Sequence, residues 1–136
     1  MSCTDKNNVK NEQNADGKII GKPELKLESD VMTPEVLWSF GRLSDVQVSP
    51  DEKTLLFGIT YYDIPEDKGN RELYTMPAEG GEMTQITKTA KGEYNAVWSK
   101  DGKSIYFMTS ADNGMQLFKI NADGSDRKQI SDIEDG

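Results

Sequence analysis

The sequence predicts an all-β chain of two four-stranded antiparallel units, preceded by a polar leader and one short helix. The main observation is an internal repeat: the segment 46–57 matches the segment 96–107, with Ser99 following Ser49 by 50 residues. Two further pairs of segments match at an offset of 44 residues, namely 73–80 with 117–124 and 85–87 with 129–131. The first unit therefore carries a six-residue insertion, which falls within residues 61–70.

Each unit is expected to contain four short strands, because its apolar segments are rich in β-branched and aromatic residues and are separated by turn residues. In the first unit they span residues 46–48, 55–60, 72–76 and 84–87, and in the second 96–98, 105–109, 116–120 and 128–131. Asp101-Gly102 supplies the positive φ angles of a tight hairpin. The equivalent Asp51-Glu52 lacks the glycine, so that turn is either of another type or mildly strained.

A four-stranded unit that recurs every 44 to 50 residues is typical of a β-propeller blade. Two blades do not close a propeller, which typically needs about four to eight. The chain divides into a disordered leader or tether (1–30), a short helix and junction (31–44), a first blade (45–92) and a second blade (93–136). The second unit ends at residue 136, so we expect the chain to be a fragment of an incomplete propeller.

The leader has a composition that favours disorder, because it lacks aromatic residues and mixes Lys and Asn with acidic residues. The pair Ile19 and Ile20 is its expected anchoring point. The Thr33-Pro34-Glu35 segment then favours a helix start, with an N-cap, a first-turn proline and an acid in the first turn. A helix this short must pack on a larger unit.

The composition excludes several classes of function. The chain has no histidine and one cysteine, which excludes a Ser-His-Asp or Cys-His catalytic arrangement, a structural zinc site and an internal disulfide. A net charge of -8 argues against nucleic acid as a partner, since phosphate binding needs a basic face. We therefore expect no catalytic, cofactor-binding or metal-binding residue in this chain.

Two repeat motifs carry a family resemblance. The Ser-Pro-Asp-x-Lys segment at 49–53 and the Trp-Ser-Lys-Asp-Gly-Lys segment at 98–103 resemble the WD40-like repeats of TolB-type propellers and of the prolyl oligopeptidase family. The stretch 32–51, in which a Thr-Pro-Glu helix runs directly into a Val-Ser-Pro-Asp strand, resembles the start of the mature peptidase in the dipeptidyl peptidase and acylaminoacyl peptidase branch. The resemblance covers residues 32–136.

The resemblance implies a larger parent protein. Members of that family carry a Gly-x-Ser-x-Gly motif in a C-terminal α/β-hydrolase domain, and neither the motif nor any histidine is present here. This chain would then be the non-catalytic leading part of a serine peptidase, whose propeller limits access of peptide substrates. Its partners would be the remaining blades and the hydrolase domain. No glutamate pair matches the one that binds the substrate amine in some members.

Two other functions stay open on the sequence alone. One is a non-enzymatic TolB-type envelope propeller that acts as a protein-binding or scaffold module. The other is a two-blade protein that closes by oligomerising. Because two blades leave apolar faces unburied, we expect the fragment to self-associate.

Cys3 is a candidate lipidation site. It follows a small residue and precedes a polar tail, as in the mature start of a bacterial lipoprotein, although no hydrophobic signal segment precedes it. Lipidation would place the protein in the bacterial cell envelope, as a periplasmic or surface lipoprotein. The alternative is an incidental cysteine.

The charged insertion of the first unit is the candidate binding loop, because loops on rigid scaffolds often carry binding. Its candidate residues are Tyr62, Asp63, Glu66, Asp67 and Arg71. The other interpretation, which the sequence favours, is a solvated long hairpin. The segment 121–126 superficially resembles a calcium loop, but Ile130 occupies the position of the required glutamate, so a hairpin turn is the better interpretation.

Overall fold

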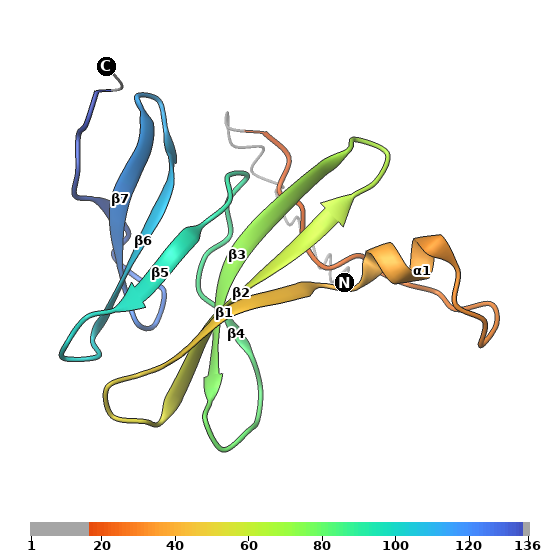
Figure 1. Ribbon diagram of the computed structural model, residues 1–136, viewed down its shortest axis with the longest axis horizontal. Helices are drawn as coiled ribbons and strands as arrows, with labels where there is room; N and C mark the ends of the chain where they lie inside the picture. Colours follow the sequence, from red (N-terminus) through yellow and green to blue (C-terminus); the bar gives the residue numbers. More distant parts are fainter. Residues whose placement is uncertain (1–16, 135–136) are drawn as a thin grey trace, which may run out of the picture.

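The computed structural model describes residues 17–134 and consists of two four-stranded antiparallel sheets with one short helix (Figure 1). Blade 1 has the strand order β1-β2-β3-β4 and blade 2 the order β5-β6-β7-β8, so each sheet is a simple meander. The elements are α1 (Pro34–Ser39), β1 (Arg42–Val48), β2 (Thr54–Asp63), β3 (Lys68–Pro77), β4 (Thr84–Gln85), β5 (Tyr94–Trp98), β6 (Ser104–Ala111), β7 (Gly114–Asn121) and β8 (Lys128–Gln129). The predicted fold class is confirmed. Cys3 lies outside the described residues.

The first turn of each blade has the same hydrogen bonds. In blade 1 the Ser49 hydroxyl donates to Asp51 at 2.5 Å and accepts from the Thr54 amide at 3.0 Å, and blade 2 repeats both contacts 50 residues later. Glu52 has a φ of 62°, and Gly102, at the equivalent position, has a φ of 70°. The turn without the glycine is therefore the same turn with a strained residue in it, because a side chain at positive φ costs about 1 kcal/mol.

The insertion of blade 1 lengthens a hairpin rather than forming a long loop. Strands β2 and β3 pair without interruption from Thr54↔Pro77 to Asp63↔Lys68, and only residues 64–67 form the turn. The predicted strands 55–60 and 72–76 were too short. The long hairpin that the sequence favours is present, and its extension includes buried residues such as Tyr61 and Asn70, which are 7% and 2% exposed.

A shared apolar core joins the two blades. Because side chains alternate across a strand, each blade has two faces. We call the face that includes Leu56 and Leu73 the trailing face of blade 1, and the face that includes Ile105 and Phe107 the leading face of blade 2. These four side chains are at most 1% exposed and pack together in one cluster, with Ile86, Ala96 and Ile120 as its other buried members. The two sheets accordingly lie side by side in Figure 1.

In each blade a buried polar side chain of the third strand binds the chain that follows the short fourth strand. In blade 1 the Glu72 carboxylate accepts hydrogen bonds of 2.6 Å from the Thr87 hydroxyl and from the Thr89 amide. In blade 2 the Gln116 side-chain carbonyl accepts equivalent bonds from Ser131 and from the backbone of residue 133. Each anchor lets the short strands β4 and β8 end in irregular chain without leaving buried backbone groups unpaired.

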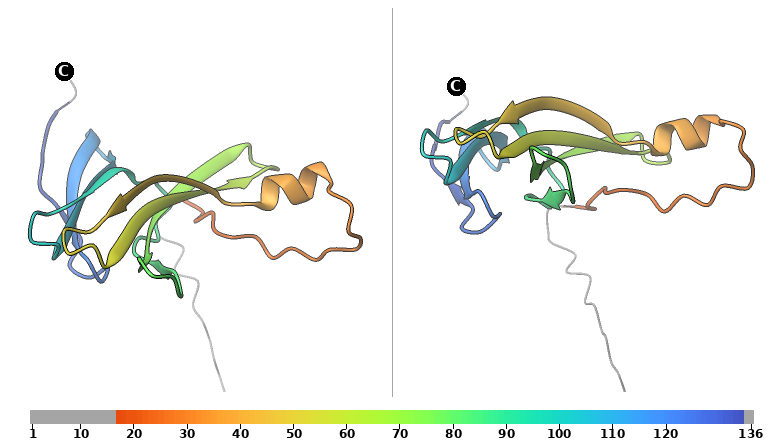
Figure 2. Two further views of the ribbon diagram at one scale, coloured as in Figure 1. Left: turned by 60° about the horizontal axis from the view of Figure 1, so that its bottom comes forward. Right: turned by 90° about the horizontal axis from the view of Figure 1, so that it is seen from below.

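The leader from residue 17 onward has no regular strand or helix, but it contacts blade 1. Ile20 is 8% exposed and packs with Phe57, Ile59 and Tyr74 on the face of blade 1 opposite to its trailing face, which we call the leading face of blade 1. From there the chain runs alongside blade 1 to the far end of the molecule and turns back into α1 (Figure 2). The leader thus contacts, through Ile20, the face of blade 1 that lies opposite to blade 2.

Candidate functional site

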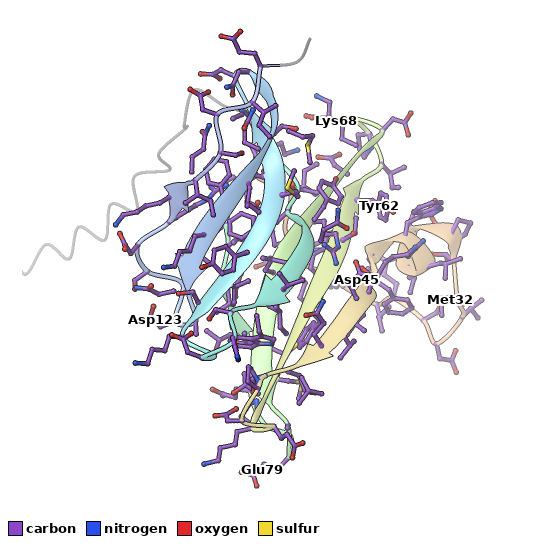
Figure 3. All side chains as sticks on the ribbon, turned by 60° about the vertical axis from the view of Figure 1, so that its left-hand side comes forward. Met32, Asp45, Tyr62, Lys68, Glu79 and Asp123 are labelled. Carbon is purple, nitrogen blue, oxygen red and sulfur yellow. The ribbon has the colours of Figure 1, made fainter. Side chains whose placement is uncertain are left out.

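A cavity of about 600 Å³ lies where the leader, α1 and the tip of the β2–β3 hairpin meet. Its walls are mainly apolar and come from three segments that are distant in sequence: residues 18–23, residues 34–39 and residues 62–65. Concave, mostly apolar sites with a few polar groups are the usual form of a ligand pocket. Figure 3 shows Tyr62 on the side of blade 1 that faces α1, with Lys68 at the hairpin tip beyond it.

The helix α1 forms one wall of the cavity. Local capping at its ends explains why this short segment is helical. The Thr33 hydroxyl accepts a hydrogen bond from the Val36 amide at 3.3 Å, and Pro34 occupies the first turn. The helix buries no residue fully and contacts the hairpin through Trp38, whose ring lies edge-on to the Tyr62 ring at a centroid distance of 5.4 Å. Its apolar side chains Leu37, Trp38 and Phe40 remain largely exposed to solvent.

A cation stabilises this aromatic pair. The Arg42 guanidinium carbon lies 4.8 Å from the centroid of the Trp38 ring and 5.3 Å from that of the Tyr62 ring. Each such contact contributes about 0.5–1 kcal/mol at an exposed site. The sequence predicted that the short helix packs on a larger unit, but it did not indicate a contact between Trp38 and Arg42. An arginine three residues after a short helix that contains a tryptophan is the signal that could have identified the cluster.

Charged groups line the rim of the cavity. Lys18 of the leader forms an ion pair with Asp63 and a longer one, of 3.6 Å, with Glu66. The hydrogen bond from Lys18 lowers the pKa of the Asp63 carboxyl, and the same bond raises the pKa of Lys18. The leader therefore contacts blade 1 through a cation at the hairpin tip as well as through Ile20.

The structure brings some of the predicted loop residues together. Tyr62 and Asp63 line the cavity, and Glu66 lies in the turn at its rim. Asp67 is an exposed turn residue with a φ of 50°. Arg71 is not part of the loop: it lies within β3 and is 5% exposed.

Arg71 has a structural role between the blades. Its guanidinium donates to the Asp45 carboxylate at 2.7 Å, to Ser44 at 3.2 Å and to the Glu93 backbone carbonyl at 2.6 Å. The side chain lies directly over Gly58, where a Cβ would come within 2.2 Å of the guanidinium. Arg71 therefore joins β1 and β3 of blade 1 to the segment that leads into blade 2.

Glu93 is a fully buried carboxyl at the same junction. One of its oxygens accepts from the Thr89 hydroxyl at 3.0 Å and from Arg127 of blade 2 at 3.2 Å, and the other forms no hydrogen bond of ordinary geometry with residues 17–134. Burial raises the pKa of Glu93 to about 7, against the opposing effect of Arg127. The Thr109 hydroxyl also lies close enough to lower the pKa of this carboxyl. The group is a candidate for pH-dependent coupling between the blades rather than for chemistry on a ligand.

Within residues 17–134 no group of three or more His, Cys, Asp or Glu side chains could hold a metal ion. In the segment with the calcium-loop-like sequence, the Gly124 amide bonds to the Asn121 carbonyl at 2.9 Å, and Asp123 accepts from Ser125. That geometry is a turn.

No helix within residues 17–134 has the length and apolar character that crossing a membrane requires.

Two meander sheets that share a core, with repeat-related turns, define the chain as a segment of a β-propeller. No family model matches the sequence. Dipeptidyl-peptidase 5 of Porphyromonas gingivalis is 41% identical over 86 residues, which are 63% of this chain and 13% of that protein. Dipeptidyl-peptidase 5 of Porphyromonas endodontalis is 28% identical over 109 residues, which are 80% of this chain and 16% of that protein.

Further matches agree in kind. The uncharacterized peptidase YuxL of Bacillus subtilis is 37% identical over 85 residues, 60% of this chain and 12% of that protein. A protein described as TolB from Agrobacterium tumefaciens is similar in structure, with a TM-score of 0.53 and 27% identity over 63% of this chain and 29% of that one. Pyrococcus horikoshii acylaminoacyl peptidase has a TM-score of 0.57 at 19% identity over 70% of this chain and 15% of that one, which supports the fold alone.

These matches confirm the resemblance predicted from the sequence, which is to the N-terminal propeller part of a peptidase of the prolyl oligopeptidase family. The chain spans less than a fifth of the length of the curated relatives it matches.

Proposed function

We propose that this chain is the non-catalytic propeller portion of a serine peptidase that cleaves peptides, and that the propeller limits which substrates reach the active site. The observation that carries the proposal is the 41% identity over 86 residues to a dipeptidyl peptidase. The hydrolysis itself would be performed by a separate α/β-hydrolase domain with a Gly-x-Ser-x-Gly nucleophile. The cavity beside Tyr62 would contribute a binding surface and no reacting group.

The test uses the complete protein that contains this chain. It should release dipeptides from short peptides, and an alanine at the serine of its Gly-x-Ser-x-Gly motif should abolish that release while the protein stays folded. A protein that continues with further four-stranded repeats and then ends would contradict the proposal. That result would instead support a TolB-type binding or scaffold module, which the 27% identity to the Agrobacterium protein favours as the second candidate.

Access control has its own test. Removing part of the propeller wall should increase cleavage of long polypeptides more than cleavage of dipeptide reporters. Equal changes for both substrates would argue against a gating role. A substitution that merely destabilises the protein would lower both rates together.

We also propose that Cys3 carries lipid and places the protein in the bacterial cell envelope. The support is the small residue before this cysteine and the polar tail after it. Mass spectrometry of the N-terminal peptide should show a thioether-linked diacylglycerol, and Cys3→Ser should move the protein from the membrane fraction to the soluble fraction. An unmodified Cys3 in protein purified from its natural host would refute the proposal.

A further inference from the structure

The turn between β6 and β7 contains Asn113-Gly114, the one Asn-Gly pair of the sequence. Gly114 has a φ of 101°, a left-handed conformation that residues with a side chain adopt only at a cost. Asn and Gly are favoured in hairpin turns because both tolerate such backbone angles. The requirements of the turn therefore explain why these two residues follow each other here.

An Asn-Gly pair is chemically labile because glycine has no Cβ. The backbone nitrogen of the residue after an asparagine is a nucleophile that attacks the side-chain carbonyl carbon, and a Cβ on that residue hinders its approach. The other asparagines within residues 17–134 are Asn70, Asn95 and Asn121, and each precedes a residue with a side chain. Asn70 is also only 2% exposed. Asn113 is thus the least protected asparagine in this part of the chain.

The Asn113 side chain lies where water reaches it. It lines an open cavity of about 550 Å³ together with Ser110 and Asp112 of its own hairpin, Lys88 of the chain after β4, and Asp132. Many of the lining groups are polar, and both aspartates are exposed. Water therefore has access to the side-chain amide, and ammonia that forms there is free to leave.

Asn113 also holds the chain that follows β8. Its side-chain amide donates a hydrogen bond to the Asp132 carboxylate, and its backbone carbonyl accepts one from Gln116 at 3.3 Å. Gln116 is fully buried and binds the same segment through Ser131. The β6–β7 turn and the segment 130–134 are therefore joined at one point, and Asn113 forms the exposed part of that contact.

We propose that Asn113 is a deamidation site and that its conversion releases the segment 130–134 from the β6–β7 turn. The Gly114 nitrogen loses its proton and bonds to Cγ of Asn113, while the bond from Cγ to Nδ2 breaks and the amide nitrogen leaves as ammonia. Water then opens the resulting succinimide ring. Attack at one ring carbonyl gives aspartate, and attack at the other gives isoaspartate.

Both products weaken the contact with the segment 130–134. Each replaces a hydrogen-bond donor by a carboxylate that faces the carboxylate of Asp132, so an attraction becomes a repulsion. Isoaspartate also adds a methylene group to the backbone of the turn and so moves the carbonyl that accepts from Gln116. The reaction needs only water, and the proposal does not depend on peptidase activity.

The first experiment incubates the complete protein that contains this chain at neutral and mildly alkaline pH and follows each asparagine by mass spectrometry after trypsin cleavage. Asn113 lies on the fragment 104–119, Asn95 on 92–100 and Asn121 on 120–127, so one digest gives all three rates. Asn113 should lose its amide several times faster than the other two, and faster at the higher pH, because the attacking nitrogen must lose its proton.

Two controls identify the reaction. Digestion in heavy-oxygen water marks any conversion that occurs during sample handling, and an isoaspartate methyltransferase should modify the aged fragment 104–119. Asn113→Gln, whose longer side chain closes a ring less readily, should remove the change from this fragment.

The second experiment measures hydrogen exchange of the segment 130–134. Exchange should be faster in Asn113→Asp and in aged wild-type protein than in fresh wild-type protein, whereas Asn121→Asp, the same change at the end of β7, should leave it unchanged. Conversion of Asn113 no faster than that of Asn121 would overturn the proposed site. Equal exchange of the segment 130–134 in fresh wild type and Asn113→Asp would overturn the proposed release.

Discussion

The buried carboxyl of Glu93 should make the stability of the protein fall as the pH rises toward neutrality. Burial raises its pKa from about 4.5 to about 7, so the folded state binds a proton more tightly than the unfolded state does. The contribution of the protonated group is fully present below pH 4.5 and is lost as the pH rises to about 7. A shift of that size corresponds to about 3 kcal/mol, since each pKa unit is about 1.4 kcal/mol.

Glu93→Gln tests this magnitude. The amide keeps an oxygen that can accept from Thr89 and Arg127, and it replaces the other oxygen by an NH2 group that can donate to the Thr109 hydroxyl. The variant should be about 1–3 kcal/mol more stable than wild type at pH 8. Loss of the ion pair with Arg127 places the expected gain below the full ~3 kcal/mol. The two proteins should differ little at pH 4.5, where the carboxyl of the folded protein is protonated.

The assay is urea unfolding followed by tryptophan fluorescence from pH 4.5 to pH 8.5. Glu79→Gln, at an exposed turn residue, is the matched control and should keep the wild-type pH dependence. The reasoning is refuted if the Glu93→Gln protein loses as much stability with rising pH as wild type does. The burial of Glu72 also raises its pKa, so a smaller dependence of the same sign should remain in the variant.

Three further changes test the packing of the blades. Glu52→Gly should stabilise the protein by about 1 kcal/mol, because its φ of 62° is the conformation that Gly102 provides in blade 2. Gly58→Ala should destabilise it by about 1–3 kcal/mol, because the new methyl group displaces the buried Arg71 guanidinium and leaves polar groups unpaired. Leu56→Ala, in the core between the blades, should cost about 2–5 kcal/mol. Equilibrium denaturation measures all three.

Controls distinguish the proposed causes. For the turn, Gly102→Ala should destabilise blade 2, and a Glu52→Gly protein no more stable than wild type would refute strain at that residue. For the ionic network, Gly58→Ala should cost much less in an Arg71→Ala background than in wild type. Equal costs in both backgrounds would show that displacement of the guanidinium is not the cause.

The sequence was sufficient to predict the blade architecture because the repeat has a simple physical origin. Strands that share a core must alternate apolar side chains, and the turns between them need the same hydrogen-bonding residues, as at Ser49 and Ser99. What the pattern did not indicate is the bulge in the first strand of each blade. At the bulges Asp45 and Asn95 have φ angles of 53° and 52°. Because Asp and Asn are also common in ordinary turns and loops, their presence in the sequence does not indicate a bulge.

The candidate site was predicted only in part. The charged insertion pointed to Tyr62 and Asp63, which do line a cavity. Arg71 was misplaced because a charged residue in a charged segment resembles a solvated one. In the β2–β3 pairing Arg71 lies opposite Thr60. Only the tertiary structure shows that Ser44, Asp45 and the Glu93 carbonyl accept hydrogen bonds from Arg71 there. The contribution of Lys18 could not be foreseen either, since it pairs with residues 45 or more positions away.

The central claim is that these two blades belong to a larger peptidase of the prolyl oligopeptidase family. The most direct measurement is to capture the intact protein from its natural host with an antibody against residues 42–129, then map its peptides by mass spectrometry and assay it on peptide substrates. The account predicts a polypeptide several times longer than this chain, with a Gly-x-Ser-x-Gly segment and serine-dependent cleavage of peptides. An intact protein that contains only further four-stranded repeats and cleaves no peptide would contradict it.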